Sequence, residues 1–440
     1  MPLKAIIILI AGLGFASKVL AIDLLETYQE ALVNDPQYAS ARALLVAGQE
    51  QSVQGRASLL PNLYGAGGYN RTKYESIPHT SETRYGINLS QPLFNWGNYQ
   101  NYEKSKLAVA VSEAQFAAAQ QELILRVAQA YFDVLTAQDV LVFAKAQTVA
   151  IGQQLESATR SFEVGTTTIT DVHESQARYD LAVAQEYAAE SDLEITRAAL
   201  QQIIGRLPDT LVPLRRDINV SHPEPNQLDT WVAQSERQNY AVAASEMILD
   251  MAKRDIALNR AGHYPTVNLV AGYNRTNTGR QFNLADATSV NSKKSGTVGV
   301  QWNIPIFSGF AITSRVRESI ALEDKARNDL EAIRRGAAQL AREAFLGLNS
   351  GLSQIRALEA AKVSSLSALD ANKLGYEVGV RINIDVLNAE QQVFSTRRDL
   401  TSARHAAIMN SLKLKYAAGI LDDGDVEQIN LLLDRATAPP

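Results

Sequence analysis

Residues 162–172 read FEVGTTTITDV, and residues 376–386 read YEVGVRINIDV. The two copies lie 214 positions apart (376 − 162), with Gly, Asp and Val in register. In each copy a Gly and a cluster of β-branched residues interrupt a long helical pattern that contains no proline, as a turn between two helices requires. Each copy is therefore predicted to form the tip of a helical hairpin, with Gly165 and Gly379 as the tip hinges.

The duplication extends over most of the chain. The pentapeptide GYNRT occurs at residues 68–72 and again at 272–276, an offset of 204 (272 − 68). The helix-ending glycines, Gly205 and Gly419, match at an offset of 214 (419 − 205). Landmarks in a constant order with a slowly drifting offset indicate an internal duplication. The join is expected within residues 206–225, where prolines preclude a helix.

Each repeat has the same predicted order of elements: a helix, two strands, a long helix, the tip and a shorter helix. The first repeat, 22–205, is expected to contain a helix over 24–58, strands over 62–75 and 83–94, a long helix over 98–162, a tip over 163–170 and a helix over 170–205. The second repeat, 226–419, is expected to contain a helix over 226–261, strands over 266–282 and 295–307, a long helix over 310–375, a tip over 376–384 and a helix over 382–418. Residues 206–225 are a linker, and residues 420–440 form a C-terminal segment and tail.

A heptad pattern supports the long helix of the first repeat. Apolar or small residues step by four and three from Leu123 to Phe162 without a slip, which is the spacing of a coiled-coil seam. A helix of about 65 residues is roughly 100 Å long at 1.5 Å per residue. The first and last helices of each repeat, about 36 residues each, would together flank this length if they stacked end to end.

The composition indicates a folded, exported protein. The 440 residues are 46% hydrophobic and 20% charged, which favours two or three structural units. Residues 1–21 resemble a secretory signal, because Lys4 precedes an apolar run and residues 19–21 (VLA) suit signal peptidase. We expect the mature chain to begin at Ile22. The apolar run is short for a bilayer span, and no transmembrane helix is expected after it.

Charge and residue usage exclude several classes of protein. The signal holds two Lys and no acidic residue, so the mature chain has 40 basic (42 − 2) and 47 acidic residues, a net charge of −7, which disfavours nucleic acid as a partner. With no Cys there is no disulfide framework, thiolate metal site or lipid-acceptor residue. The five His lack the i, i+4 pairing of zinc sites, and no phosphate loop or nucleophile elbow occurs. We expect no metal, no cofactor and no enzymatic activity.

The predicted strands alternate between an apolar and a polar face. In residues 297–304, Val298, Val300, Trp302 and Ile304 share one face. This alternation, with aromatic residues near the strand ends, suits a membrane barrel and equally suits a soluble antiparallel sheet. Four strands cannot close a barrel, which needs about eight, and lipid does not tolerate open edges. A membrane barrel would therefore be shared between chains, and counting leaves both a dimer with eight strands and a trimer with twelve open.

These features together resemble the TolC family of Gram-negative outer-membrane exit ducts. The resemblance rests on the signal peptide, the duplicated order of elements, the sequence LPNL at 60–63 and the two VG-x5-DV tips, and it covers essentially the whole mature chain. It implies a mainly α fold with a small β part: duplicated helical hairpins form a periplasmic α-barrel, and four strands per chain contribute to a trimeric 12-stranded outer-membrane β-barrel. The linker and the segment after Gly419 would form a belt around the middle of the tunnel.

The resemblance also implies a function and partners. Such ducts pass drugs or secreted proteins from an inner-membrane ABC exporter or proton-driven pump, together with a periplasmic adaptor protein, across the periplasm and the outer membrane. They open by an iris-like movement of the helical tips and perform no chemistry. The alternative is a periplasmic coiled-coil adaptor or scaffold without a membrane barrel, but an adaptor is expected to have one hairpin framed by sheet-rich halves, whereas this chain has two hairpins that each carry a strand pair.

Gate residues follow from the same resemblance. In the family pattern a Tyr and an Arg of the second tip bond to a Thr-Asp pair of the first tip, and the matching residues here are Tyr376, Arg381, Thr170 and Asp171. Two plainer interpretations stay open. Tyr376 continues the heptad seam of its helix and could serve packing alone, and Arg381 could be a solvated surface charge.

Two further family features are altered in this chain. A Gln–Glu contact between the hairpins has its Gln at Gln154, but Lys373 occupies the position of the Glu, so the bond must differ. Of two acidic pore rings, Asp385 fits the first and Asn388 replaces the second, which predicts weaker selectivity for cations at this constriction. The alternative for Asp385 is that it caps the helix that begins there, as Asp171 would in the first copy.

Overall fold

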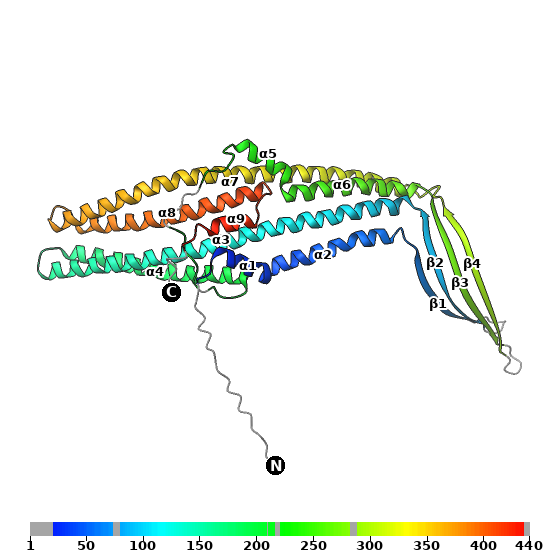
Figure 1. Ribbon diagram of the computed structural model, residues 1–440. Coiled ribbons are helices and arrows are strands. Elements are labelled where there is room, and N and C mark those ends of the chain that lie inside the picture. Colours follow the sequence, from blue (N-terminus) through cyan, green and yellow to red (C-terminus); the bar gives the residue numbers. More distant parts are fainter. Residues whose placement is uncertain (1–20, 74–79, 209, 216–220, 282–287, 435–440) are drawn as a thin grey trace, which may run out of the picture.

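The computed structural model describes residues 21–73, 80–208, 210–215, 221–281 and 288–434. The predicted signal peptide, apart from Ala21, lies outside the described residues. The helices run side by side as an elongated bundle, with a sheet at one end and two helical tips at the other (Figure 1). The predicted fold class, mainly α with a small β part, is confirmed.

The two repeats contain the same series of elements. The first consists of α1 (Leu24–Asn34), α2 (Pro36–Ala57), β1 (Asn62–Thr72), β2 (Thr80–Phe94), α3 (Trp96–Glu163) and α4 (Ile169–Ile204). The second consists of α5 (Leu228–Gln238), α6 (Tyr240–Arg260), a short 3₁₀ turn η1 (Ala261–His263), β3 (Thr266–Gln281), β4 (Thr288–Asn303), α7 (Ala311–Glu377) and α8 (Asn383–Ala417), and α9 (Asp423–Asn430) follows.

The first helix of each repeat is broken, which the sequence-based prediction missed. The helix expected over 24–58 divides at Asp35, whose backbone is extended (φ −68°, ψ 119°) because Pro36 excludes the helical region for the residue before it. The helix expected over 226–261 divides at Asn239 with nearly the same backbone (φ −62°, ψ 129°). The two breaks are 204 positions apart (239 − 35), the offset of the GYNRT pair, so the repeat symmetry is kept even though only the first break contains a proline.

The C-terminal end of each hairpin packs against one of these breaks. Gly205, at the end of α4, has φ 81° and lies against Asn34, and Gly419, just beyond α8, has φ 72° and lies against Gln238. A Cβ atom at Gly419 would stand 2.2 Å from the carbonyl oxygen of Gln238. Glycine is required there both for the left-handed backbone and for the close approach.

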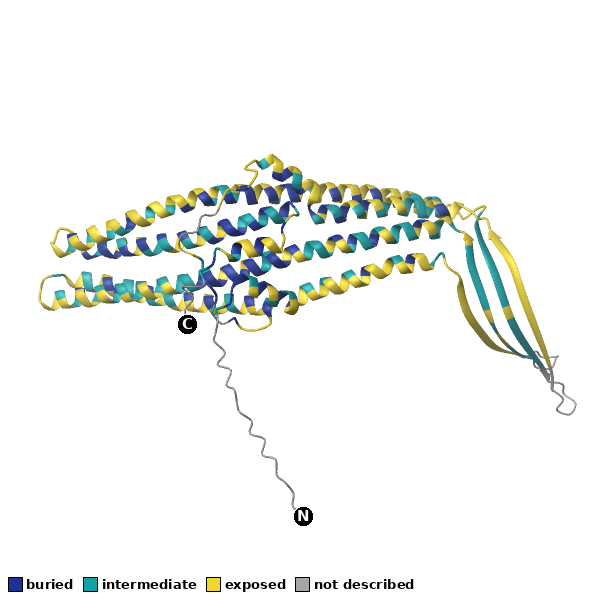
Figure 2. Ribbon diagram, viewed as in Figure 1, coloured by how far each residue is buried: buried dark blue, intermediate teal, exposed yellow. Residues whose placement is uncertain are grey.

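The strands of the two repeats join into a single antiparallel sheet in the order β1-β2-β3-β4. The central pairing, β2 with β3, sets Tyr85 opposite Arg275. Strand β4 begins at Thr288 and ends at Asn303, so the prediction of 295–307 was wrong at both ends. Pro305 has no N–H to extend the ladder. Within the described residues, the outer edges of β1 and β4 pair with no other strand, and both strands are exposed (Figure 2).

The main core lies halfway along the bundle. Buried apolar residues of α1, α3, α4, α8 and α9 meet there around Tyr131, whose hydroxyl donates to the carbonyl oxygen of Val212 at 2.8 Å. Isolated β-bridges join Ile22 to Leu211 and Leu214 to Leu433. The linker before the second repeat and the C-terminal segment after it are therefore hydrogen-bonded to each other and to the start of the first repeat, at the middle of the bundle.

Among the described helices, α3 alone is long and apolar enough to cross a membrane, with a stretch of mean hydropathy 1.3. Length and composition alone do not show a membrane span, so the expectation that no transmembrane helix follows the signal stays a prediction. The seam residues Leu123, Val127 and Val134 are at most 1% exposed, because α3 packs against α2, α4, α6 and α8. The apolar seam of α3 thus follows from its central place in the bundle, whereas only 28% of the membrane-length stretch is buried.

Candidate gate at the helical tips

Both tips have the same backbone geometry. In the first, Gly165 has φ 76°, and the amide of Thr166 donates to the carbonyl of Ser161 at 2.9 Å. In the second, Gly379 has φ 78°, and the amide of Val380 donates to the carbonyl of Gly375 at 2.9 Å. This bonding closes the C-terminal end of a helix when a residue adopts the left-handed conformation, which glycine does without strain.

Asp171 is part of a capping box at the start of α4. The N-cap is Thr168, and one oxygen of Asp171, Oδ2, accepts from the Thr168 hydroxyl at 2.8 Å and its amide at 3.1 Å, and also from the Thr167 hydroxyl. These hydrogen bonds, from Thr167 first and then Thr168, lower the pKa of Asp171. The alternative that Asp171 is itself the N-cap was wrong, because it occupies the third helical position.

Asp385 occupies the equivalent position at the start of α8. The N-cap is Ile382, which supplies no side-chain acceptor, so the N-cap interpretation was wrong for Asp385 as well. Its carboxylate instead lies 3.6 Å from the guanidinium of Arg381, one helical turn away. Arg381 also folds over Gly375, where a Cβ atom would stand 2.7 Å from its Cγ. A carboxylate in the first turn is favoured by the helix dipole.

Lys373 pairs within its own hairpin. Its ammonium lies 2.9 Å from Glu390 Oε1, which joins α7 to α8. The Glu390 side chain is 7% exposed, and its other oxygen, Oε2, has no hydrogen-bond partner among the described residues. The Lys373 side chain is half-exposed, but its removal would leave the buried Glu390 carboxylate without its counter-ion, so this pair helps to tie the two helices of the second hairpin together.

Gln154 bonds to the other hairpin through Asn383. The Gln154 side-chain amide donates to Asn383 Oδ1, and Asn383 Nδ2 donates to the Ser175 hydroxyl at 2.7 Å. Asn383 is 5% exposed and Ser175 is fully buried. We call Gln154, Ser175 and Asn383 the Asn383 cluster, which connects α3, α4 and α8.

Asn388 also faces the first hairpin. Arg178 of α4 donates to Asn388 Oδ1 at 3.3 Å and to Gln391 Oε1 at 3.2 Å. The residue that replaces the second acidic ring is therefore bound to a cation of the same chain. Both bonds are exposed, so each contributes little to stability.

The structure brings together only part of the set predicted from the sequence. In the part of the chain that is described, neither Tyr376 nor Arg381 is hydrogen-bonded to Thr170 or Asp171. Thr170 is exposed, and Tyr376 is half-buried. Sequence reasoning missed four residues in contacts at this end of the bundle: Ser175, Arg178, Asn383 and Glu390. Polar residues at positions 383 and 390 on the buried, coiled-coil face of α8 were the signal that could have revealed two of them.

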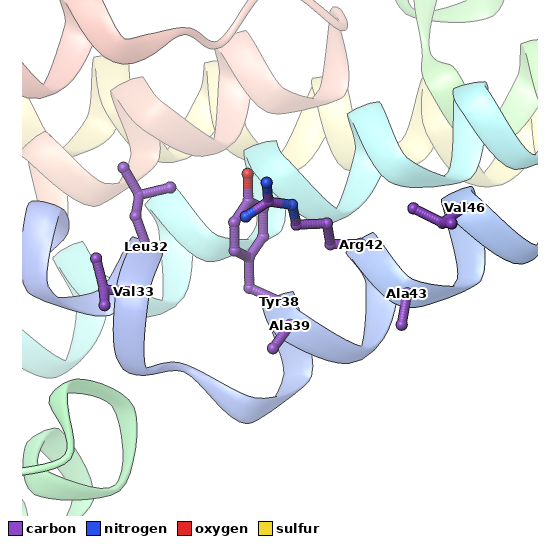
Figure 3. Close-up of a pocket in the computed structure, with 7 residues that line it drawn as sticks. All are labelled: Leu32, Val33, Tyr38, Ala39, Arg42, Ala43 and Val46. Carbon is purple, nitrogen blue, oxygen red and sulfur yellow. The ribbon is translucent and has the colours of Figure 1, made fainter.

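Two further findings concern the described surface away from the tips. A hollow at the break between α1 and α2 is lined by seven side chains, of which Arg42 alone is charged (Figure 3). Within the described ranges, no group of three or more His, Asp or Glu side chains is placed to hold a metal ion.

Comparison with known proteins agrees with this architecture. The family described as outer membrane efflux protein matches residues 27–206 and 231–420, one segment for each repeat. The chain is 34% identical to the outer membrane protein TolC of Vibrio cholerae over 96% of both chains. It is 30% identical to the alkaline protease secretion protein AprF of Pseudomonas aeruginosa, over 93% of this chain and 87% of AprF. The fold matches the CmeC outer membrane channel of Campylobacter jejuni with a TM-score of 0.79 and 17% identity, over 93% and 90% of the two chains.

These relatives give no support to the alternative of a periplasmic adaptor. The relatives imply that the chain assembles as a trimer and that it functions together with efflux or secretion machinery. The resemblance noted in the sequence is confirmed over nearly the full chain. The chain therefore belongs to the outer membrane efflux protein family, as a TolC-type channel-tunnel of the outer membrane with a periplasmic helical tunnel, a transporter and not an enzyme.

Proposed function

We propose that the tips of three copies form a gate that is closed at rest and opens by an iris-like movement when a periplasmic adaptor and an inner-membrane pump engage the tunnel. The pump is an ABC exporter or a proton-driven transporter. The observation that carries this proposal is the pair of matched tips, which share one backbone geometry but differ in side chains: acceptors in the first, Tyr376 and Arg381 in the second.

The sheet supports the sharing of a barrel between chains. Its outer strands, β1 and β4, leave a row of backbone donors and acceptors without partners in the described chain. Apolar side chains such as Val298 and Trp302 are 81% and 70% exposed. In a bilayer, unpaired backbone groups cost several kcal/mol each. Pairing of β4 of one copy with β1 of the next would satisfy both edges, and lipid would cover the apolar face.

The first tip offers acceptors for a neighbouring tip. All the hydrogen bonds that the Asp171 carboxylate accepts in the described chain go to Oδ2. Its other oxygen, Oδ1, is thus open to a donor from another hairpin. The Arg381 side chain is 59% exposed, and its one ion pair within the described residues, with Asp385 at 3.6 Å, costs little to exchange. We infer that Arg381 and the Tyr376 hydroxyl donate to Thr170 and Asp171 across the hairpins in the closed gate.

Beyond this contact, three copies of Asp385 form the constriction. While Arg381 stays paired with Asp385 it partly neutralises this carboxylate, an effect that is lost when Arg381 bonds to the first tip, and Asn388 adds no second charge. A single acidic ring of this kind favours cations less than two rings would.

The similarity to AprF favours secreted proteins as the cargo. That relative is described as an alkaline protease secretion protein, and the match extends over 93% of this chain. An ABC exporter is then the partner pump. Drug efflux with a proton-driven pump is the second candidate, supported by the family description.

Conductance of single channels in planar bilayers tests the gate. Arg381→Ser and Tyr376→Phe are each expected to raise the conductance of the resting channel. Arg398→Ser is the control that should not, because it removes an exposed Arg of α8 whose one ion pair among the described residues is with its neighbour Asp399. Unchanged conductance in the Arg381→Ser, Tyr376→Phe double variant would exclude this gate. Detergent extraction of a heat-labile trimer from outer membranes checks the assembly, whereas a soluble monomer in the periplasmic extract would contradict it.

A further inference from the structure

Gate opening requires that the second hairpin move relative to the first, so the contacts between the hairpins decide what holds the closed state. Near the tips, the contacts of α8 with the first hairpin include the Asn383 cluster, the exposed bonds of Arg178 and an apolar cluster formed by Leu387, Ile151 and Ala182. Of these polar contacts, only the Asn383 cluster contains buried side chains, Asn383 and Ser175, whereas its third member, Gln154, is half-buried.

Both functional groups of the Asn383 amide are used across the hairpin boundary. The carbonyl oxygen accepts from Gln154 of α3, and the amino group donates to Ser175 of α4 at 2.7 Å. One residue in the first turn of α8 therefore holds both helices of the first hairpin. A buried amide that loses such partners bears the full cost of desolvation, so these bonds favour a single arrangement of the hairpins.

The apolar cluster lies one turn further along α8. Leu387 is 3% exposed and packs against Ile151, which is 4% exposed, and Ala182, which is 2% exposed. This layer keeps water from the Asn383 cluster on the side that faces the middle of the bundle. Hydrogen bonds in such an environment are stronger than the same bonds in water.

The second hairpin also contacts the first at a point further from the tips. His405 of α8 lies 2.6 Å from the Thr136 hydroxyl of α3. The 22 residues between positions 383 and 405 correspond to roughly 33 Å of helix. The Lys373–Glu390 pair lies within the second hairpin and ties α7 to α8. The tip half of this hairpin can thus swing as a unit about the His405 level, and such a swing separates Asn383 from Gln154 and Ser175.

We propose that Asn383 is the residue that holds the second hairpin against the first in the closed gate, within one chain, and that opening breaks its bonds to Gln154 and Ser175. This proposal rests on the proposed function, because it assigns a positioning residue to the same gate. It differs in place and in partners from the Tyr376 and Arg381 contacts at the tip.

Channel recordings on the full-length trimer test the assignment. Asn383→Ala should raise the fraction of time spent in the higher-conductance state about tenfold, as expected for the loss of one buried and one part-buried hydrogen bond. Ser175→Ala, which removes one bond and leaves Asn383 in place, should give a smaller rise of about threefold. Gln392→Ala is the control, because in the described part of the chain the Gln392 side chain bonds only to Thr396 of the same helix, and its recordings should match wild type.

A covalent contact separates a gating role from a structural one. The chain has no Cys, so the double variant Ser175→Cys, Asn383→Cys contains the only two thiols. With both thiols reduced, the channel should behave as Asn383→Ala does. Joined by oxidation or by a short bis-thiol reagent, it should stay in the low-conductance state, and reductant should reverse this. A merely structural role would not produce a reversible change.

The outcomes distinguish this proposal from the gate on which it rests. If Arg381→Ser raises conductance but Asn383→Ala, Ser175→Ala and the reduced double variant all behave as wild type, Asn383 does not hold the gate and the tip contacts stand. If Arg381→Ser and Asn383→Ala both leave the recordings unchanged, the gate itself is refuted. Should Asn383→Ala fail to form trimers, Ser175→Ala and the cross-linked double variant decide, and an absence of effect in both overturns the assignment.

Discussion

Replacement of His405 by Gln should remove the part of the acid-induced loss of stability that His405 contributes between pH 6.5 and pH 4. The His405 side chain is buried between α8 and α3, with its Nδ1 atom 2.6 Å from the Thr136 hydroxyl and its ring 5.2 Å from that of Phe132. Burial, and then the charge of Arg404, lower the pKa of His405 from 6.5 to about 4. The native chain therefore holds this imidazole in the neutral form.

The sign and size follow from proton linkage. Below pH 6.5 the unfolded chain binds a proton at His405, whereas the native chain binds one only near pH 4, so falling pH favours unfolding. With these two pKa values, the free energy of unfolding falls by about 1.5 kcal/mol per chain at pH 5.5 and about 2.5 kcal/mol at pH 4.5, relative to pH 8. The Gln variant has no such proton to bind. The free energy of unfolding of wild type should therefore fall toward that of the variant by these amounts as the pH falls.

Urea unfolding of the detergent-solubilised trimer, followed by helical circular dichroism at one fixed protein concentration, measures this difference, since an oligomer's stability depends on concentration. His173→Gln is the matched control, because His173 is exposed on α4. Its pH profile should follow that of wild type. Profiles of His405→Gln and wild type that run parallel from pH 8 to pH 4.5 would refute the reasoning, since the imidazole would then titrate alike in both states.

Three other predictions concern separate parts of the molecule. Asp385→Asn should weaken the block of conductance by trivalent cations, and persistence of the block would place cation binding at another group. Asp35→Ala should lower the free energy of unfolding by about 3–4 kcal/mol, because Asp35 caps α2 and accepts two 3.0 Å hydrogen bonds from Arg126. Urea unfolding measures this loss, and an effect below about 1 kcal/mol would contradict a stabilising Asp35–Arg126 pair. Gly379→Ala should destabilise the second tip by about 1–2 kcal/mol, because alanine is strained at the positive φ of this residue. Hydrogen exchange at the amide of Val380 should become roughly tenfold faster, and unchanged exchange would show that the tip relaxes.

Features that depend on neighbours along the chain could be predicted from the sequence. The tip glycines, Gly165 and Gly379, were found because a left-handed residue that ends a long helical pattern has few alternatives to glycine. The long helices and the strand faces followed from their periods of 3.5 and 2. The break at Asn239 was missed because Asn is tolerated inside helices, whereas its equivalent, Asp35, precedes a proline that could have been recognised.

The side-chain contacts at the candidate gate could not be predicted in the same way. Asn383 meets Ser175 across 208 positions and Gln154 across 229, and Lys373 meets Glu390 instead of Gln154. Such pairs depend on how far one helix is rotated against another, and a rotation by one residue would direct each side chain elsewhere. The sequence by itself determined that the chain is two hairpins with glycine tips and a strand pair each. The tertiary structure decided which polar groups hold those hairpins together, because hydrogen bonds require a match of a few tenths of an ångström that only the packed helices provide.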